Sequence, residues 1–185
     1  RLKGMVTKYH NAHLYITEVP DLDVILGEEI DIRRYSRSMF SRIMCSSLIP
    51  KNIHRVLYID CDTLILENVT ELFNLNLKGK TVAAVNDCRN KRYNDNLGMK
   101  EDSIYINSGV LLIGLDRYRN EQYESFLIEK IKKHNGELEF PDNDIICRYL
   151  EDDILIIPPK FNATSVLFSS NWKQLQALRK PHRCF

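Results

Sequence analysis

The sequence predicts an α/β protein in which helices flank a mostly parallel central sheet. Its 185 residues are 44% hydrophobic and 28% charged, which supplies one sizeable core and is typical of a globular domain. Short apolar runs alternate along the chain with polar segments of helical periodicity. Continuous apolar runs favour strands that are buried on both faces, as in parallel sheets. We therefore expect one domain over residues 1–185.

The strands are expected where apolar residues cluster between turn-forming residues. The clearest run is VLYI, which is rich in strand-forming side chains. Another, GVLLIGL, begins at Gly109, and the last short run ends at the pair Pro158 and Pro159. The expected strands cover residues 13–19, 56–59, 81–85, 109–115 and 154–157.

The helices are expected where apolar residues recur every three or four positions. Ser36 or Ser38 can cap the first of them, and Pro50 follows its end. Gly136 stands where it would terminate a second helix, and Pro141 suits the first turn of a third. The expected helices cover residues 36–48, 116–135 and 142–150. Residues 21–36, acidic and then basic, are expected to form a surface loop.

Charge and cysteine content exclude several classes of function. The chain has 26 basic and 25 acidic side chains, so no broad basic field would attract nucleic acid. Its five cysteines are widely spaced and form no CxxC pair, which argues against a disulfide framework or a zinc site. The sequence has no apolar run long enough to cross a bilayer. These features predict a reduced, cytoplasmic protein.

Two aspartates stand where the apolar run 56–59 ends. In extended backbone, Asp60 and Asp62 would point the same way, because they are two residues apart. Ligands of open α/β sheets bind beyond the carboxyl ends of strands, and paired carboxylates suit Mg²⁺ or Mn²⁺ bridging phosphate oxygens. A plain turn explains the same spacing, since Asp often bonds nearby backbone amides. The pair alone leaves both interpretations open.

A phosphatase of the haloacid dehalogenase class is an alternative. That class also carries two aspartates, two residues apart, after an apolar strand. Its motif then has one further residue before a Thr, whereas Thr63 directly follows Asp62. The class also needs a downstream Lys and an acidic pair after an apolar strand, for which the sequence offers no good candidate. We rank this alternative below a transferase.

Several blocks occur in a fixed order around the aspartate pair. An FSRI segment contains Arg42, and the blocks that follow read VLYIDCDTLI, YINSGVLLIGL, DNDIIC and IPPKFN. With these blocks the chain, from Ser36 to Asn162, resembles glycosyltransferase family 8. Members of that family carry a YxRL helix and then vlYLDaDtlv, YFNaGVlliNL, DQDxlN and LPxxYN. Such an ordered set is far more specific than the aspartate pair alone.

The resemblance implies a GT-A fold, a UDP-hexose donor carrying glucose or galactose, Mn²⁺ (or Mg²⁺) dependence, and retention of anomeric configuration. It implies transfer to a hydroxyl of a glycan, glycolipid or protein, as in surface polysaccharide or lipopolysaccharide synthesis. By position, it implies metal ligands at Asp60 and Asp62, donor contacts at Arg42, Asp60, Asp62, Asn107, Ser108 and Asp144, and catalytic residues at Asn143, Asp142 and Asp87.

The chain departs from the family pattern at three places. Asn143 replaces the Gln of DQD and is one methylene shorter, which changes the depth of the sugar pocket. No segment matches the ADxNY run of the nucleotide-binding strand. The family's HxxGxxKPW, which holds the third metal ligand, has only KPHRCF with His182 in its place.

These departures give two expectations. The first is that the 185 residues belong to a longer polypeptide, which supplies N-terminal strands, a downstream His ligand and any peripheral attachment to the cytoplasmic face of a membrane. The alternative is a truncated, non-catalytic module that binds a sugar nucleotide.

Overall fold

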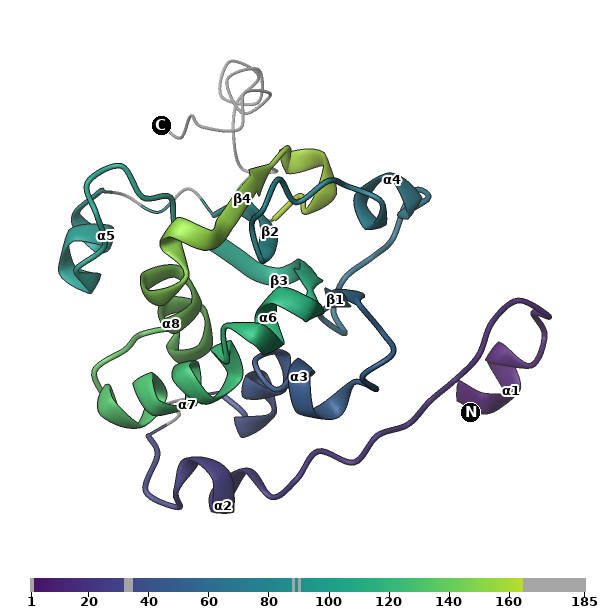
Figure 1. The fold of residues 1–185 in the computed structure, drawn as a ribbon, viewed down its shortest axis with the longest axis horizontal. Helices are drawn as coiled ribbons and strands as arrows, with labels where there is room; N and C mark the ends of the chain where they lie inside the picture. The colour runs from purple at the N-terminus through teal and green to yellow at the C-terminus, as the bar shows by residue number, and fades with distance from the viewer. Residues whose placement is uncertain (1, 32–34, 88, 90, 165–185) are drawn as a thin grey trace.

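The structure, a computed structural model, describes residues 2–31, 35–87, 89 and 91–164. Helices surround a four-stranded sheet whose strand order is β1-β3-β2-β4 (Figure 1). The strands are β1 (Arg55–Ile59), β2 (Val82–Asn86), β3 (Ile106–Gly114) and β4 (Ile154–Ile157). Each coincides with an apolar run that the sequence predicts. The expected strand over 13–19 is absent: these residues have no regular structure, and Tyr15 and Ile16 are exposed.

The described sheet is mixed, which confirms the α/β class but corrects the expected strand directions. β3 runs antiparallel to both β1 and β2, and only β2 and β4 pair in parallel. The apolar pattern of β3 has another cause than a parallel sheet. Its residues alternate between two hydrophobic clusters, with Leu111 and Ile113 in one and Val110 and Leu112 in the other. An unbroken apolar run therefore reports burial on both faces and carries no information on direction.

The helices are short, and two of them divide a segment that was expected to be one helix. Residues 115–133 form α6 (Leu115–Asn120) and α7 (Tyr123–Lys133), because Gln122 between them has φ 55° and breaks the helical path. Gly136 follows α7 with φ 74°, as its expected role at a helix end requires.

The remaining helical segments follow the sequence in part. Ser36 accepts a hydrogen bond from the Ser38 N–H, as the expected cap would, but the helix after it is interrupted. The region 21–36 contains a helix, α2, where only a loop was expected. The segments are α1 (Leu2–Val6), α2 (Leu22–Leu26), η1 (Arg37–Arg42), α3 (Cys45–Leu48), α4 (Thr70–Phe73), α5 (Lys91–Leu97), α8 (Pro141–Tyr149), η2 (Glu151–Asp153) and η3 (Pro159–Phe161).

Two hydrophobic layers hold the sheet. The larger layer packs β3 and β2 against α6, α7 and α8, and it includes Phe40, Leu127 and Ile145, which are almost fully buried. The smaller layer lies on the other face, where Leu72 of α4 meets Leu112. None of the helices in the described ranges is both long and apolar enough to span a membrane.

Candidate functional site

The strand directions bring the predicted site residues together at one edge of the sheet. β3 runs opposite to β1 and β2, so the start of β3 lies beside the ends of the other two. Asp60 follows β1, Asp87 follows β2, and Asn107 and Ser108 belong to the start of β3. The first turn of α8 adds Asp142 and Asn143.

These residues line a single hollow of about 410 Å³, which we call the carboxylate cleft. Its rim includes the side chains of Tyr35, Arg89 and Phe140. The predicted residues that line it are Asp60, Asp87, Asn107, Ser108, Asp142 and Asn143. The cleft thus joins residues that are far apart in the sequence, such as Asp60 and Asn143.

Arg42 lies behind the cleft and ties its acidic groups together. Its Nη2 donates to Asp60 Oδ1 at 2.9 Å, its Nε lies 3.1 Å from Asp142 Oδ2, and its Nη1 donates to the Ser108 carbonyl at 2.8 Å. The side chain is nine-tenths buried, so its charge is screened little by water. The guanidinium therefore holds two carboxylates in place and offsets part of their charge. The Arg42 Cζ lies over the Tyr58 ring, 4.9 Å from its centroid.

Asp60 presents only one of its oxygens to the cleft. Its Oδ1 accepts hydrogen bonds from Arg42 and from the Tyr58 hydroxyl, the latter at 2.6 Å. Its Oδ2 lies over Gly109, where a Cβ would approach that oxygen and Asn107 Oδ1 to 3.0 Å each. The missing side chain of Gly109 therefore leaves a cradle in which two hard oxygen atoms converge.

Asp62 does not follow the geometry that its spacing predicts. The strand ends at Ile59, and the Thr63 N–H bonds to the Asp60 carbonyl at 3.1 Å, so the backbone turns instead of staying extended. Asp62 is exposed. Both aspartates nevertheless line a second hollow of about 710 Å³, which also contains Asn107 and Gly109 and which we call the apolar cleft.

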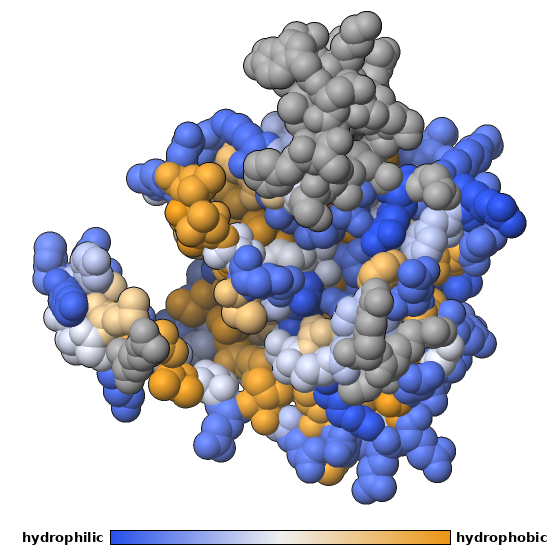
Figure 2. Space-filling view, turned by 180° about the vertical axis from the view of Figure 1, so that it is seen from behind, coloured by the Kyte–Doolittle hydropathy of each residue, from blue (hydrophilic) through white to orange (hydrophobic). Residues whose placement is uncertain are grey.

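The apolar cleft adjoins the carboxylate cleft and takes its name from the segment after the aspartate pair. Leu64 and Leu66 of that segment are 79% and 81% exposed, which is unusual for large apolar side chains so near each other in the sequence. Figure 2 shows further apolar residues at the surface of the face that it presents.

Burial raises the pKa of two carboxyl groups in the carboxylate cleft. For Asp142 the largest cause is desolvation, which the nearby Arg42 charge opposes. For Asp87 the cause is again burial, opposed by hydrogen bonding to Asn107 and by the charge of Arg89. The Asn107 amide donates to Asp87 Oδ1 at 3.1 Å, and Arg89 Nε donates to Asp87 Oδ2 at 3.1 Å.

Asn143 has hydrogen-bonding capacity directed at the cleft. Its Nδ2 donates to the Ile106 carbonyl at 2.9 Å, which fixes the amide. Its Oδ1 is buried and has no hydrogen-bond partner among the residues that the structure describes. Buried acceptors are rarely left without a partner, so this oxygen is suited to a bound molecule.

Asp144 is brought beside the cleft but does not line it. Its carboxylate accepts hydrogen bonds from Tyr105 Oη at 2.5 Å, Tyr93 Oη at 3.0 Å and the Phe140 N–H at 2.9 Å. The residue is completely buried. This placement gives Asp144 a role in holding the start of α8, and the donor contact that the family pattern implies stays a prediction.

The carboxylates of Asp60 and Asp62, which both line the apolar cleft, fit a hard divalent cation. Carboxylate oxygens are the donor type that Mg²⁺ and Mn²⁺ prefer, and Mg²⁺ often takes only one or two protein carboxylates besides phosphate oxygens. Asn107 Oδ1 already accepts hydrogen bonds from the Gly109 N–H and from Asn162. No group of three or more His, Cys, Asp or Glu side chains gathers as a metal site within the described ranges. His182 lies outside the described residues.

Sequence reasoning missed three residues that the structure adds to the site. Tyr58 is two residues before Asp60, and Arg89 is two residues after Asp87; their side chains contact those carboxylates. Asn162 donates to Asn107 Oδ1 at 2.8 Å from beyond β4. The two-residue spacing of Tyr58 and Asp60 is a signal that could have found the first, because alternate strand residues share a face.

The fold and the cleft together define an α/β domain of the GT-A type. The chain belongs to glycosyl transferase family 8, whose family model matches residues 7–182.

Among curated proteins, the chain is 28% identical to general stress protein A of Bacillus subtilis over 75% of its own length and 49% of that protein. It is 23% identical to lipopolysaccharide 1,2-glucosyltransferase of Escherichia coli over 69% of its length and 39% of that enzyme. Among solved structures, it resembles galactosyltransferase LgtC in complex with donor and acceptor sugar analogues, with a TM-score of 0.70 and 22% identity. That likeness covers 89% of this chain and 61% of LgtC. The chain thus spans half or less of the length of these curated relatives.

Proposed function

We propose that the chain transfers a hexosyl group, glucose or galactose, from a UDP-sugar to an acceptor hydroxyl with retention of configuration. The observation that carries this proposal is the carboxylate cleft. It gathers Asp60, Asp87, Asn107 and Asn143 from separate elements, and the buried Asn143 Oδ1 has no hydrogen-bond partner among the described residues. Carboxylates and amides are the groups that bind sugar hydroxyls, and the match to family 8 places the chain among glycosyltransferases and sets aside the phosphatase alternative.

A divalent cation, Mn²⁺ or Mg²⁺, would be held by Asp60 and Asp62. When bound, such an ion neutralises charge on the departing diphosphate as a Lewis acid. The Tyr58 hydroxyl and Arg42 fix Asp60 Oδ1, which leaves Oδ2 turned toward the cradle over Gly109.

Other side chains of the carboxylate cleft would bind and orient the sugar. Asp87, Asn107 and Ser108 offer hydrogen-bonding atoms to its hydroxyls, and Arg42 keeps Asp142 beside them. The Asn143 Oδ1 supports positive charge that develops on the sugar ring as the bond between C1 and the phosphate oxygen breaks. The acceptor hydroxyl forms the new bond to C1 from the same face, and its proton passes to the departing diphosphate oxygen.

The names of the relatives support a role in glycan synthesis. The Escherichia coli relative is a lipopolysaccharide glucosyltransferase, and LgtC is a galactosyltransferase seen with donor and acceptor analogues. A glycan, glycolipid or protein acceptor in surface polysaccharide synthesis fits these names. A non-catalytic sugar-nucleotide module is the second candidate, because no group of three or more His, Cys, Asp or Glu side chains gathers as a metal site within the described ranges.

The test is UDP release from UDP-glucose and UDP-galactose in the presence of Mn²⁺, with the anomeric configuration of the product read by NMR. The transferase proposal expects UDP release that stops on chelation and resumes when Mn²⁺ is restored. Metal-dependent UDP binding without any release, with water or with mixed glycan acceptors, would instead establish the non-catalytic module. Release that is indifferent to chelation would contradict the metal assignment.

A further inference from the structure

A guanidinium group at the rim of the carboxylate cleft has donors that the protein does not use. Arg89 lines the cleft, and its side chain is 35% exposed. Only its Nε takes part in a hydrogen bond, to Asp87 Oδ2 at 3.1 Å. Within the described ranges, neither Nη nitrogen has a partner.

Aromatic rings hold this guanidinium in a fixed position. The Arg89 Cζ lies 4.4 Å from the centroid of the Phe140 ring and 5.5 Å and 5.7 Å from those of Tyr93 and Tyr105. Phe140 in turn contacts Tyr35 across 6.1 Å between ring centroids. An Arg that is stacked on rings and anchored through Nε is pre-organised, so it loses little conformational entropy when its outer edge binds a ligand.

A role as the counterion of Asp87 explains only part of this arrangement. Asp87 already accepts a hydrogen bond from Asn107, and the Nε contact supplies the balancing charge. The parallel N–H groups at the other edge of a guanidinium match the two oxygens of a carboxylate. A neutral hydroxyl would use only one of these two donors.

We propose that Arg89 makes the cleft selective for a sugar that bears a carboxylate, as in a hexuronate. This proposal rests on the proposed function, because that function makes the ligand a sugar. What it adds is the chemical class of one bound sugar. That sugar is either the one transferred, in which case the hexosyl donor is a hexuronosyl donor, or the one that accepts.

The experiment compares matched pairs of ligands by NMR titration. The donor is tested by comparing UDP-glucuronate with UDP-glucose, both in the presence of Mn²⁺. The acceptor is tested by comparing methyl glucuronoside with methyl glucoside, each titrated into the protein alone. In at least one pair, the carboxylate member should bind about tenfold tighter or more, because a charge-assisted bidentate contact is added. The pair that shows the preference identifies the sugar that carries the carboxylate.

Three variants show whether Arg89 is the cause. Arg89→Gln should abolish the preference while UDP still binds with Mn²⁺, and Arg89→Lys should retain part of it, because the charge remains but the fork is lost. Lys91→Gln is the matched control: it removes the same charge from an exposed ion pair with Glu101 and should leave the preference unchanged. Thermal melting establishes that each variant is folded.

The outcomes separate this inference from the proposed function. Equal affinities within both pairs, or a preference that survives Arg89→Gln, would overturn the inference even if UDP binds with Mn²⁺. Conversely, a preference for methyl glucuronoside that depends on Arg89, in a protein that binds no UDP, would sustain the inference while the proposed function fails.

Discussion

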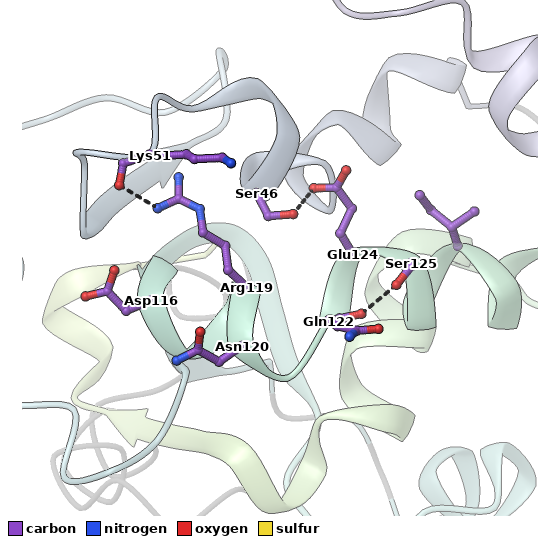
Figure 3. A pocket seen from close by; sticks show the side chains of 9 residues that line it. Ser46, Lys51, Asp116, Arg119, Asn120, Gln122, Glu124 and Ser125 are labelled. Carbon is purple, nitrogen blue, oxygen red and sulfur yellow. Dashed lines mark hydrogen bonds between the residues drawn. The ribbon is translucent and has the colours of Figure 1, made fainter.

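Two polar hollows of the protein differ in which partners their side chains bind within the chain. One is the carboxylate cleft. The other, of about 630 Å³, lies between α3, α6 and α7, and we call it the helix hollow; Figure 3 shows its lining. The residues that line the helix hollow are Ser46, Lys51, Asp116, Arg119, Asn120, Gln122, Glu124, Ser125 and Ile128.

In the helix hollow, two charged side chains are engaged by the protein itself. Arg119 donates through its Nη atoms to the carbonyls of residues 49, 50, 51 and 53. Glu124 accepts hydrogen bonds from the Ser46 hydroxyl and the Ser47 N–H. One buried atom, Arg119 Nε, has no partner in the described part of the chain, whereas both Nη atoms donate to the loop after α3.

In the carboxylate cleft, the balance is different. Asp60 and Asp142 pair with Arg42, Asp87 pairs with Arg89, and Tyr58 and Asn107 donate further hydrogen bonds to Asp60 and Asp87. Asn143 Oδ1 has no partner within the described ranges. Three carboxylates meet in this hollow although it is smaller than the helix hollow, so the residues that line a hollow identify a site better than its volume does.

The largest expected effect separates the two hollows by activity. Asp60→Asn or Asp62→Asn should reduce UDP release by about 10²-fold or more, because a charged ligand of the proposed metal is lost. The matched control, Asp116→Asn, removes a carboxylate from the helix hollow that pairs only with exposed His54, and it should leave UDP release unchanged. Equal losses in the cleft and control variants would remove the distinction between the hollows.

The next effect tests the unsatisfied amide of Asn143. Asn143→Ala should lower kcat about tenfold or more with little change in UDP affinity, because the lost oxygen acts on the sugar in the transition state. Asn143→Gln sharpens the test, because it restores the side chain that the family carries at this position. Its activity is expected to lie between those of wild type and Asn143→Ala. A parallel loss of UDP affinity with an unchanged kcat would assign the residue to nucleotide binding. Steady-state rates and UDP titration supply both quantities.

The helix hollow should respond in stability instead of activity. Arg119→Ala removes the donors that hold the carbonyls of the loop after α3, and we expect it to lower the free energy of unfolding by about 1–3 kcal/mol. UDP affinity should not change. Urea denaturation followed by circular dichroism gives the first quantity. A variant that lost UDP affinity at unaltered stability would show that the helix hollow binds ligand.

The smallest effect is a pH dependence of stability. The folded-state pKa of Asp142 is raised by burial, so its contribution to stability is full below the ordinary carboxyl pKa and declines as pH rises through the folded value. The melting temperature of wild type minus that of Asp142→Asn should therefore fall as the pH rises from about 4.

Glu101 provides a control of opposite sign for this measurement. Its hydrogen bond to Lys91 lowers its pKa, so its contribution is present above the ordinary carboxyl pKa and is lost as pH falls. The melting difference between wild type and Glu101→Gln should accordingly rise with pH. Equal slopes for the two variants would show that burial does not govern the pKa of Asp142.

Sequence reasoning located the elements better than it located their contacts. Apolar runs found all the described strands, since strand formers need only local burial, and Pro141 marked the start of α8. Strand direction was not accessible, because an antiparallel strand covered on both faces has the same pattern as a parallel one.

The site was predicted where the family's ordered blocks supplied its residues, and it was missed where a contact is not part of those blocks. The Asp60–Asn107–Asn143 grouping followed from the family's ordered blocks. The bond from Asn162 to Asn107 joins residues 55 apart, and no local pattern encodes it. Asp144 shows the reverse case: its place in a motif suggested a ligand contact, whereas two Tyr hydroxyls take up its carboxylate.

The central claim is that the strand-end cleft binds a nucleotide diphosphate through a cation held by the aspartate pair. Isothermal titration of UDP into the protein, with and without Mn²⁺, tests it most directly. We predict that wild type and Asp116→Asn bind UDP only when Mn²⁺ is present and that Asp60→Asn does not bind under either condition. Equally tight UDP binding without metal, or undiminished binding by Asp60→Asn, would contradict the account.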